Sequence, residues 1–361
     1  MEDNFIGKIR RAIESTPELC ARTLCGIGDD AAILGGFPGN LAVTTDLLCD
    51  EVDFLVGKDS ARNIGRKALA VNLSDLAAMG AVPLAVVVSL LLPQSVDGEE
   101  NPTARFAEEF YEGMLPLAKM FQVAMAGGDT NSWKGKFAVS VTALGAVSAN
   151  HALLRSGAHP GDRILVTGPL GGSIFGRQFH FMPRIAEALF LSRNYEIHAA
   201  MDISDGLLLD LSRMARESGV GFNLEEGKVP IHPDTLAPPK DARSYPGWEE
   251  ETPPLAHALT DGEDFELILA VPQEEATRLV SEQPFQAMAH NTEVSNSFLD
   301  TMRQICADSQ FDLSPALIRS LSQARLVDIG TFAKSDTGMN VIDTAGHARP
   351  VSGKTGWTYG F

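Results

Sequence analysis

The chain has 361 residues, of which 44% are hydrophobic and 21% charged, and its formal net charge is −18. This length favours two domains over a single core, and the composition is typical of a soluble globular protein. Because the acidic balance leaves no basic stripe that could neutralise phosphates, we expect neither a nucleic acid nor a membrane as partner.

The four cysteines form no CxxC pair and no zinc-like spacing with histidine, which favours reduced thiols and a cytoplasmic location. Residues 1–14 lack the apolar region of a signal peptide, and the apolar run near 85–92 is too short to cross a bilayer. The eight histidines show no HExxH or HxxxH spacing, so the sequence does not predict zinc-dependent hydrolysis.

Strand-like and helix-like segments alternate along the first half of the chain. The longest helical pattern has Asp59 or Ser60 as its expected N-cap and Gly80 as its expected stop. The GGDT segment is expected to form a tight turn between two strands. The expected elements are a helix at 5–15, strands at 31–34 and 41–45, a helix at 59–79, a strand at 84–92, a helix at 101–121, and strands at 123–126 and 137–147.

A polar stretch with glycine and proline, residues 155–163, separates the two halves, so we predict domains at 1–150 and 151–361. Residues 281–322 are polar and weakly patterned, and we expect a helical insertion there. The expected elements of the second half are a strand at 164–167, helices up to about 191, a strand at 199–203, a helix from about 206 and a strand at 265–271.

Several aspartates stand at the edges of apolar or glycine-rich runs instead of on solvated helix faces. They are Asp29, Asp30, Asp46, Asp75, Asp129, Asp202 and Asp205. A carboxylate at the end of a buried strand loses hydration and needs a cation, and converging carboxylates repel one another unless a divalent metal lies among them. Oxygen ligands around Mg²⁺ that also binds substrate phosphates fit this pattern, which predicts a Mg²⁺-dependent enzyme acting on a nucleotide.

The first two of these positions also allow other interpretations. Asp29 and Asp30 follow Gly-Ile-Gly, which resembles a dinucleotide-binding fingerprint, but that motif needs a strand before it, and here the strand is expected after it. Thr44 and Thr45 place hydroxyls beside Asp46, which suits a hard metal and equally suits a strand end followed by a turn.

Asp75 lies in the apolar helical stretch ALAVNLSDLAAMGA. We expect that Asn72, Ser74 and Asp75 cannot all face a core, because a buried aspartate without a partner is costly. A polar stripe, or a cap on a neighbouring helix, is the alternative to a metal or nucleotide contact, and we favour the contact.

Two glycine-rich segments and one polar turn complete the pattern. The glycines of GGDT (127–130) would let a ligand approach the backbone, although an ordinary β-turn has the same sequence. GPLGG (168–172) is expected to form a glycine loop that opens a helix, where free N–H groups could hold an anion, although the motif alone is a weak signal. Ser204 or Asp205 suits a helix N-cap, whereas capping leaves Asp202 unexplained.

Taken together and in order, eight segments resemble the thiamine-monophosphate kinases, a family in the superfamily of aminoimidazole ribonucleotide synthetase and selenophosphate synthetase. The segments are GIGDDAA, VTTD, KALAVNLSDLAAMGA, GGDT, LLRSGAHPGD, VTGPLGGS, DISDGLLLDL and GEDFEL, between about Gly26 and Val271. The resemblance implies an α/β (α+β) fold of two domains. A mixed N-terminal sheet with helices would dimerise, and a C-terminal α/β sandwich would enclose a metal–ATP cleft with it.

The resemblance also implies an activity and a partner set. The γ-phosphoryl group of ATP would pass to the phosphate of thiamine monophosphate, giving thiamine diphosphate and ADP, in a homodimer with several Mg²⁺ ions. The implied metal ligands are Asp30, Thr44, Thr45, Asp46, Asp75, Asp129, Asp202 and Asp205. The implied ATP-binding residues are Tyr111, Gly128, Asp129, Arg155 and Ser204, and the implied substrate-binding residues are Asp53, Glu263, Trp357 and Phe361. Asp46, Asp75, Asp129 and Arg155 would serve catalysis.

The chain departs from the family pattern at two places near the implied acceptor site. Asp53-Phe54 stands where members often have His-Phe, and Asp261 stands where they have glycine. Another enzyme of the superfamily, resembling aminoimidazole ribonucleotide synthetase, and a non-catalytic nucleotide-binding relative are the alternatives. Selenophosphate synthetase would need a reactive cysteine in an N-terminal glycine-rich loop, and Cys20 and Cys25 lie outside such a loop.

Overall fold

The structure is a computed structural model. It describes residues 23–25, 29–30, 32–37, 39–94, 102–148, 152–236, 252–287, 296, 298–300, 324–352 and 355–356. The helix expected at 5–15, most of the insertion expected at 281–322, and the terminal aromatics Trp357 and Phe361 lie outside these residues.

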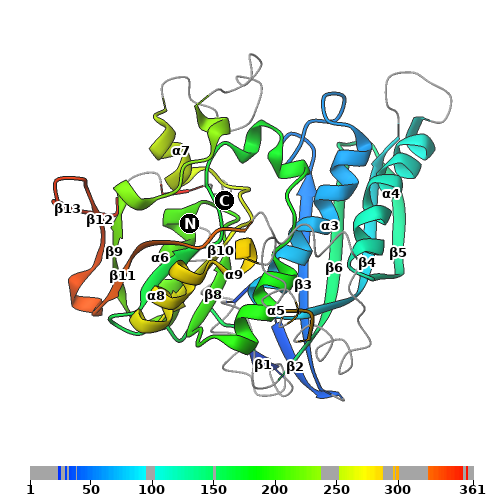
Figure 1. Cartoon of the computed structure of the whole chain (residues 1–361). Helices are drawn as coiled ribbons and strands as arrows, with labels where there is room; N and C mark the ends of the chain where they lie inside the picture. The colour runs from blue at the N-terminus through cyan, green and yellow to red at the C-terminus, as the bar shows by residue number, and fades with distance from the viewer. Residues whose placement is uncertain are drawn as a thin grey trace.

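The first half of the chain forms a six-stranded mixed sheet. Its strand order is β1 (Thr23–Cys25), β2 (Ala32–Phe37), β3 (Gly39–Cys49), β6 (Ala138–Val147), β4 (Val82–Pro93) and β5 (Ala124–Trp133). All neighbours are antiparallel except β4 and β5, which run parallel. Two helices, α3 (Ala61–Ala78) and α4 (Pro102–Met120), lie against one face of this sheet (Figure 1).

The second half forms a seven-stranded sheet. Its order is β13 (Ala348–Pro350), β12 (Met339–Ile342), β9 (Gly221–Glu225), β11 (Val327–Ala333), β7 (Arg163–Val166), β10 (Leu267–Val271) and β8 (Ala199–Asp202). The α-helices described in this half are α5 (Ile185–Asn194), α6 (Leu207–Ser218), α7 (Pro254–Thr260), α8 (Gln273–Glu282) and α9 (Pro284–Ala287). The 3₁₀ turns are η1 (Ser173–Phe175), η2 (Arg177–Phe179), η3 (Glu226–Lys228), η4 (Pro233–Thr235) and η6 (Ser335–Thr337).

The central strands of this second sheet are buried on both faces. Successive side chains point to opposite faces of the sheet, and each face is covered by other elements. Ile164, Met201 and Ile268 join one hydrophobic cluster with α6, whereas Leu165 and Leu267 join another with α5 and the first domain. This arrangement matches the α/β sandwich expected for the second half.

Helix α3 is the element that joins the two halves. It contacts β3, β6 and α4 in the first half, and α5 and β8 in the second. Ser60 caps its start by accepting a hydrogen bond from Asn63 N at 3.2 Å, and Gly80 follows its end with φ 62°. Because several elements cover it, the second half of this helix is buried almost all round: every residue from Ala68 to Ala78 except Asp75 is buried.

The burial of α3 agrees with one prediction. Asn72 and Ser74 are both fully or almost fully buried, whereas Asp75 is only partly buried and joins a cluster of aspartates, so the three polar residues do not all face a core. Asn72 Nδ2 donates to Ala68 O at 3.1 Å, and Ser74 Oγ donates to Asp202 at 2.6 Å. Hydrogen bonds to partners on the same helix and on β8 lower the cost of burying these groups.

The GGDT segment is also different from its prediction, because it is not a turn. Residues 127–130 lie inside β5, which runs beside β4 from Ala124 to Trp133. A Cβ on Gly128 would lie 1.9 Å from Val88 O, so this glycine lets β4 approach closely. None of the helices in the described part of the chain combines the length and apolarity that a bilayer crossing requires.

Candidate active site

Three aspartates from distant parts of the chain meet at the junction of the two sheets. Asp30 precedes β2, Asp75 lies near the end of α3, and Asp202 is the last residue of β8. Each offers a carboxylate oxygen within 4.8 Å of the other two. The packing of α3 against β8 brings Asp75 and Asp202 together, which no local sequence pattern determines.

Hydroxyl groups fix two of these carboxylates. Thr44 Oγ1 donates to Asp75 Oδ2, and Ser74 Oγ donates to Asp202 Oδ2 at 2.6 Å. Ser74 and Asp75 are consecutive residues of a helix and therefore point in directions that differ by about 100°. As a result, Ser74 faces the second domain while Asp75 faces β3.

Arg155 supplies positive charge beside this cluster. Its guanidinium pairs with Asp30 Oδ1, and its backbone N–H donates to both carboxylate oxygens of Asp29, at 3.1 and 3.0 Å. Burial disfavours the charged form of Arg155, but Asp30 and Asp29 outweigh burial and raise its pKa. Arg155 thus stays charged, although it neutralises only part of the cluster.

The remaining carboxylates disfavour one another's ionised form. Burial, together with the neighbouring Asp46, Asp202 and Asp30, raises the pKa of Asp75 well above its usual value. Burial and Asp30 raise the pKa of Asp202 in the same way. Within the described residues, Asp30 Oδ2 and Asp46 Oδ2 are buried without a hydrogen-bond partner. Orphaned oxygens in an oxygen-only donor set are what a hard divalent cation such as Mg²⁺ requires.

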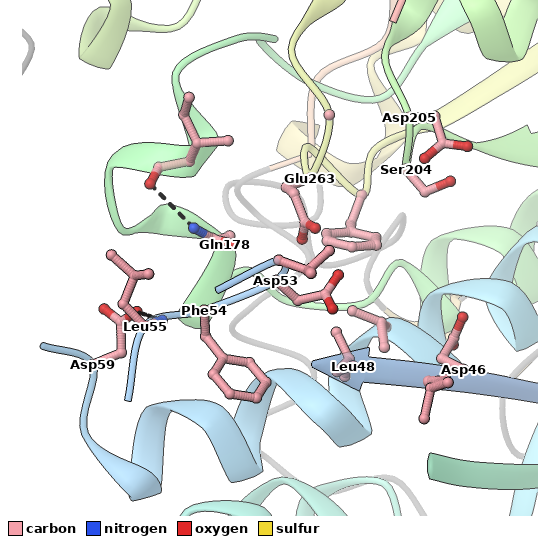
Figure 2. Close-up of a pocket in the computed structure, with 16 residues that line it drawn as sticks. Asp46, Leu48, Asp53, Phe54, Leu55, Asp59, Gln178, Ser204, Asp205 and Glu263 are labelled. Carbon is pink, nitrogen blue, oxygen red and sulfur yellow. Dashed lines mark hydrogen bonds between the residues drawn. The ribbon is translucent and has the colours of Figure 1, made fainter. Parts of the chain in front are cut away.

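Asp46 connects this cluster to a cavity of about 220 Å³ between the two domains. Burial, Glu263 and Asp53 raise the pKa of Asp46 to about 7. Figure 2 shows Asp53 and Glu263 projecting into the same part of the pocket, with Ser204 and Asp205 along another side. The cavity is lined by Asp46, Leu47, Leu48, Val52, Asp53, Phe54, Leu55, Asp59, Val71, Ile174, Gln178, Ser204, Asp205, Gly262, Glu263 and Phe265.

Lys67 lies behind this pocket, and the sequence patterns did not single it out. The residue is 0% exposed, and its ammonium group donates to Asp53 O at 2.7 Å and to Gln178 Oε1 at 2.5 Å. It also lies 2.8 Å from Glu263 Oε2. A lysine inside an otherwise apolar helical pattern was the available signal, because a buried lysine needs partners.

The loop from Ser204 to Gly206 is held by Asp210, another residue that the sequence analysis missed. Asp210 Oδ2 accepts hydrogen bonds from the N–H groups of Ser204, Asp205 and Gly206 at 3.0, 2.9 and 3.1 Å. Arg213 pairs with both Asp205 and Asp210. An acidic residue in the first turn of α6 was the signal for this role.

Four of the predicted site residues do not join the cluster. Thr45 projects to the opposite face of β3 from Thr44 and is exposed, with its hydroxyl 3.0 Å from Thr142 Oγ1. Side chains alternate along a strand, so Thr44 and Thr45 cannot both face the site. Asp129 is exposed on β5, where its carboxylate accepts from Thr130 N, and Gly128 lies beside it. Tyr111 packs on the core from α4.

The glycine loop at 168–172 binds anions that belong to the protein itself. Gly171 N donates to both oxygens of Asp264, at 3.0 and 2.9 Å, and Gly172 N donates to Asp261 at 3.0 Å. The loop is followed by the short 3₁₀ turn η1 instead of a long helix. Its N–H groups thus anchor the segment that carries Glu263, and this loop is no phosphate cradle.

Comparison with known proteins gives the site its context. The first half matches the AIR synthase related protein N-terminal domain over residues 28–147, and the second matches the C-terminal domain of the same group over residues 159–289. Thiamine-monophosphate kinase of Rhodopirellula baltica is 40% identical over 290 residues, which cover 78% of this chain and 85% of that protein. Thiamine-monophosphate kinase of Bacillus subtilis is 36% identical over 272 residues, which cover 69% of this chain and 78% of that protein.

Solved structures agree with these relatives. One described as "AaThiL complexed with AMPPCP and TMP" has a TM-score of 0.69 and 25% identity, covering 98% of this chain and 95% of that one. The structure of thiamine-monophosphate kinase from Stenotrophomonas maltophilia K279a has a TM-score of 0.59 and 28% identity. The match covers 94% of this chain and 96% of that one. From its sequence, its two domains and its fold, the chain belongs to the thiamine-monophosphate kinase family.

Proposed function

We propose that this chain is a kinase that transfers the γ-phosphoryl group of ATP to the phosphate of thiamine monophosphate. The observation that carries this proposal is the meeting of the Asp30, Asp75 and Asp202 carboxylates beside the interdomain pocket that Asp46 lines. The relatives that share both domains are named for this reaction, and one similar structure is described with an ATP analogue and TMP bound.

We propose Mg²⁺ as the metal, held by Asp30, Asp46, Asp75 and Asp202. The donor set supports this choice, because it consists of oxygens, includes two buried oxygens that have no hydrogen-bond partner among the described residues, and brings together carboxylates that disfavour one another's ionised form. When bound, Mg²⁺ would neutralise phosphate oxygens and hold the attacking and leaving oxygens in line.

The chemistry of the pocket suits the thiamine part of the acceptor. Its lining includes the carboxyl groups of Asp53 and Glu263 and the aromatic rings of Phe54 and Phe265. Thiamine carries a cationic thiazolium ring, and a cation is attracted both to carboxylates and to the faces of aromatic rings. Asp53, at the position where family members often have histidine, adds negative charge at this point.

The reaction needs no general base from the protein. The attacking oxygen belongs to a phosphate that is already ionised at neutral pH, so the protein has to position two anions and offset their repulsion. Arg155 lies beside Asp30 and would place a fixed positive charge near the phosphates. The loop from Ser204 to Gly206, held by Asp210, would present the Ser204 hydroxyl group on the other side of the pocket.

We also propose that the chain works as a homodimer. The face of the first sheet that α3 and α4 leave uncovered bears Leu47, 66% exposed, and Val87, 38% exposed. Asp129 lies three strands away from β3, roughly 14 Å at the usual strand spacing. A two-fold partner that covers this face could bring its own Asp129 to the site of the first copy.

An acceptor screen tests the kinase activity. The chain is incubated with ATP and Mg²⁺ alone, with thiamine, or with thiamine monophosphate, and ADP release and product mass are measured. We expect ADP only with thiamine monophosphate, in equal amount with thiamine diphosphate. ADP release that is the same with and without an acceptor would contradict the proposal, and so would nucleotide binding without turnover. The cytoplasm is our proposed location, based on the cysteine pattern.

A further inference from the structure

We propose a second metal site, for a first-row transition cation such as Zn²⁺, formed by His159, Asp162 and His198. These residues each offer a ligand atom within 4.8 Å of the others. His159 Nδ1 lies 3.1 Å from His198 Nδ1, and His198 Nδ1 lies 2.8 Å from Asp162 Oδ2. Two imidazole nitrogens and a carboxylate are a borderline donor set, which suits zinc, cobalt or nickel and does not suit Mg²⁺.

The strand order of the second sheet brings Asp162 and His198 to the same place. β10 is antiparallel to both β7 and β8, so β7 and β8 run in the same direction and begin at the same end of the sheet. Ile164 and Ala199 pair with Ala270 from its two sides, so the residues that precede β7 and β8 flank β10 at the same end of the sheet. Asp162 lies two residues before Ile164 and His198 directly precedes Ala199, and their side chains meet at this end although 36 residues separate them in the chain.

The histidine cluster and the aspartate cluster lie at opposite ends of strand β8. Asp202 ends β8 and His198 precedes its start, so about 13 Å of strand lies between them at the usual rise per residue. The cluster is therefore separate from the proposed kinase site and is free to bind its own cation.

The second ring nitrogen of His198 supports a ligand role. His198 Nε2 lies 3.0 Å from Glu196 Oε1, and a histidine that binds a metal commonly donates its other N–H to a carboxylate in this way. With the proton on Nε2, the lone pair of Nδ1 faces the lone pairs of Asp162 Oδ2 and His159 Nδ1. Either a proton or a cation must lie among these three atoms, and a metal ion satisfies all three together.

The site is also accessible and anchored. Asp162 is 5% exposed and accepts a hydrogen bond from His159 N at 2.7 Å, which fixes its carboxylate. The His159 side chain is 67% exposed, so a cation can enter from solvent and His159 can be replaced without disturbing the core. The rival arrangement is a protonated His198 paired with Asp162, and metal binding distinguishes the two.

Cobalt titration of the full chain, carrying no affinity tag, tests the proposal. Co²⁺ is added to metal-free protein in a large excess of Mg²⁺, which occupies the oxygen-only site, and visible absorption and equilibrium dialysis report binding. We expect one Co²⁺ per chain, displaced by Zn²⁺, and an affinity at least about tenfold lower in His159→Ala.

His347→Ala is the matched control, because His347 is exposed and lies 3.2 Å from the Asp343 carboxylate, and no other histidine of the described residues forms a metal-ligand group with this pair. It should bind Co²⁺ as the unchanged chain does. Equal binding by the unchanged chain and a His159→Ala/His198→Ala double variant would overturn the proposal, as would no Co²⁺ bound at equimolar metal. All variants should keep their Mg²⁺-dependent kinase activity, so a failure here is distinguishable from a failure of the proposed reaction.

Discussion

The ammonium group of Lys67 lies 2.8 Å from Glu263 Oε2, and this ion pair of a buried lysine and a partly buried glutamate joins the two domains at the interdomain pocket. Lys67 belongs to α3 in the first domain, whereas Glu263 lies in the loop before β10 in the second. Glu263 has a φ of 69°, a backbone conformation that is strained for a residue with a side chain. The pair therefore holds a strained residue at the wall of the pocket.

Replacing Lys67 with methionine should weaken both the fold and acceptor binding. The change leaves Glu263, whose side chain is 22% exposed, without its cation. Because breaking a fully buried pair costs about 3–5 kcal/mol, we expect a loss below this range. We expect a lower free energy of unfolding in urea, and a KM for thiamine monophosphate that rises more than the KM for ATP. Lys228→Met is the matched control, because its partner Glu225 is solvent-accessible and such pairs contribute about 1 kcal/mol or less. Equal effects of the two variants would contradict the anchoring role of Lys67.

Asp46→Asn should abolish most turnover while leaving the fold intact. The amide keeps the size of the side chain but removes the charge that would hold a cation, and loss of such electrostatic stabilisation costs about 100-fold or more in kcat. Because Asp46 is buried among other carboxyls, its neutral replacement should not lower the melting temperature. Turnover at saturating Mg²⁺ and thermal unfolding measure the two effects, and near-normal turnover would remove Asp46 from the metal site.

The stability of the metal-free chain should fall as pH rises from about 4 to about 7. Burial, Glu263 and Asp53 raise the pKa of Asp46 from 3.8 to about 7, so the folded chain keeps a proton in this range that the unfolded chain has lost. Stability decreases with pH wherever the folded state binds more protons. Asp75 and Asp202 shift in the same direction.

Mg²⁺ should reverse this trend, because it binds the deprotonated carboxylates. Thermal unfolding at pH 5.5 and pH 8, with and without Mg²⁺, measures the effect. We expect the larger Mg²⁺-dependent rise in melting temperature at pH 8. A rise that is the same at both pH values would mean that these carboxylates are already ionised at the lower pH.

Mixing two inactive variants should restore activity if Asp129 serves the site of a partner copy. In a dimer of one Asp46→Asn chain and one Asp129→Asn chain, one site would contain both changes and the other would contain neither. Co-refolded mixtures should recover up to about a quarter of normal activity, because random pairing gives mixed dimers in half of the population. Light scattering should show a dimer. No recovery from a mixture that has exchanged subunits would place Asp129 outside the partner's site.

Local patterns in the sequence identified much of what the structure contains. The order of the motifs indicated thiamine-monophosphate kinases, which the relatives and the two matching domains confirm. The two-domain α/β fold is confirmed as well, while the division at 150 and 151 stays a prediction. The cap at Ser60 and the stop at Gly80 were predictable, because caps depend on neighbouring residues alone.

Other features depended on contacts between distant segments. GGDT has the composition of a turn, yet pairing with β4 makes it part of a strand. GPLGG has the composition of a phosphate loop, yet Asp261 and Asp264 occupy its N–H groups. In both cases the local preference is weak, and the tertiary partner decides which of two conformations or ligands is adopted.

The sequence by itself indicated a set of candidate carboxylates, because a carboxylate at the end of an apolar run loses hydration and needs a compensating partner. Only the tertiary structure decided which of them meet. Strand order and alternation set Thr44 inside and Thr45 outside, and helix packing brought Ser74 to Asp202 and Lys67 to Glu263. Such pairings arise from the burial of apolar faces across the whole chain, which no local stretch of sequence encodes.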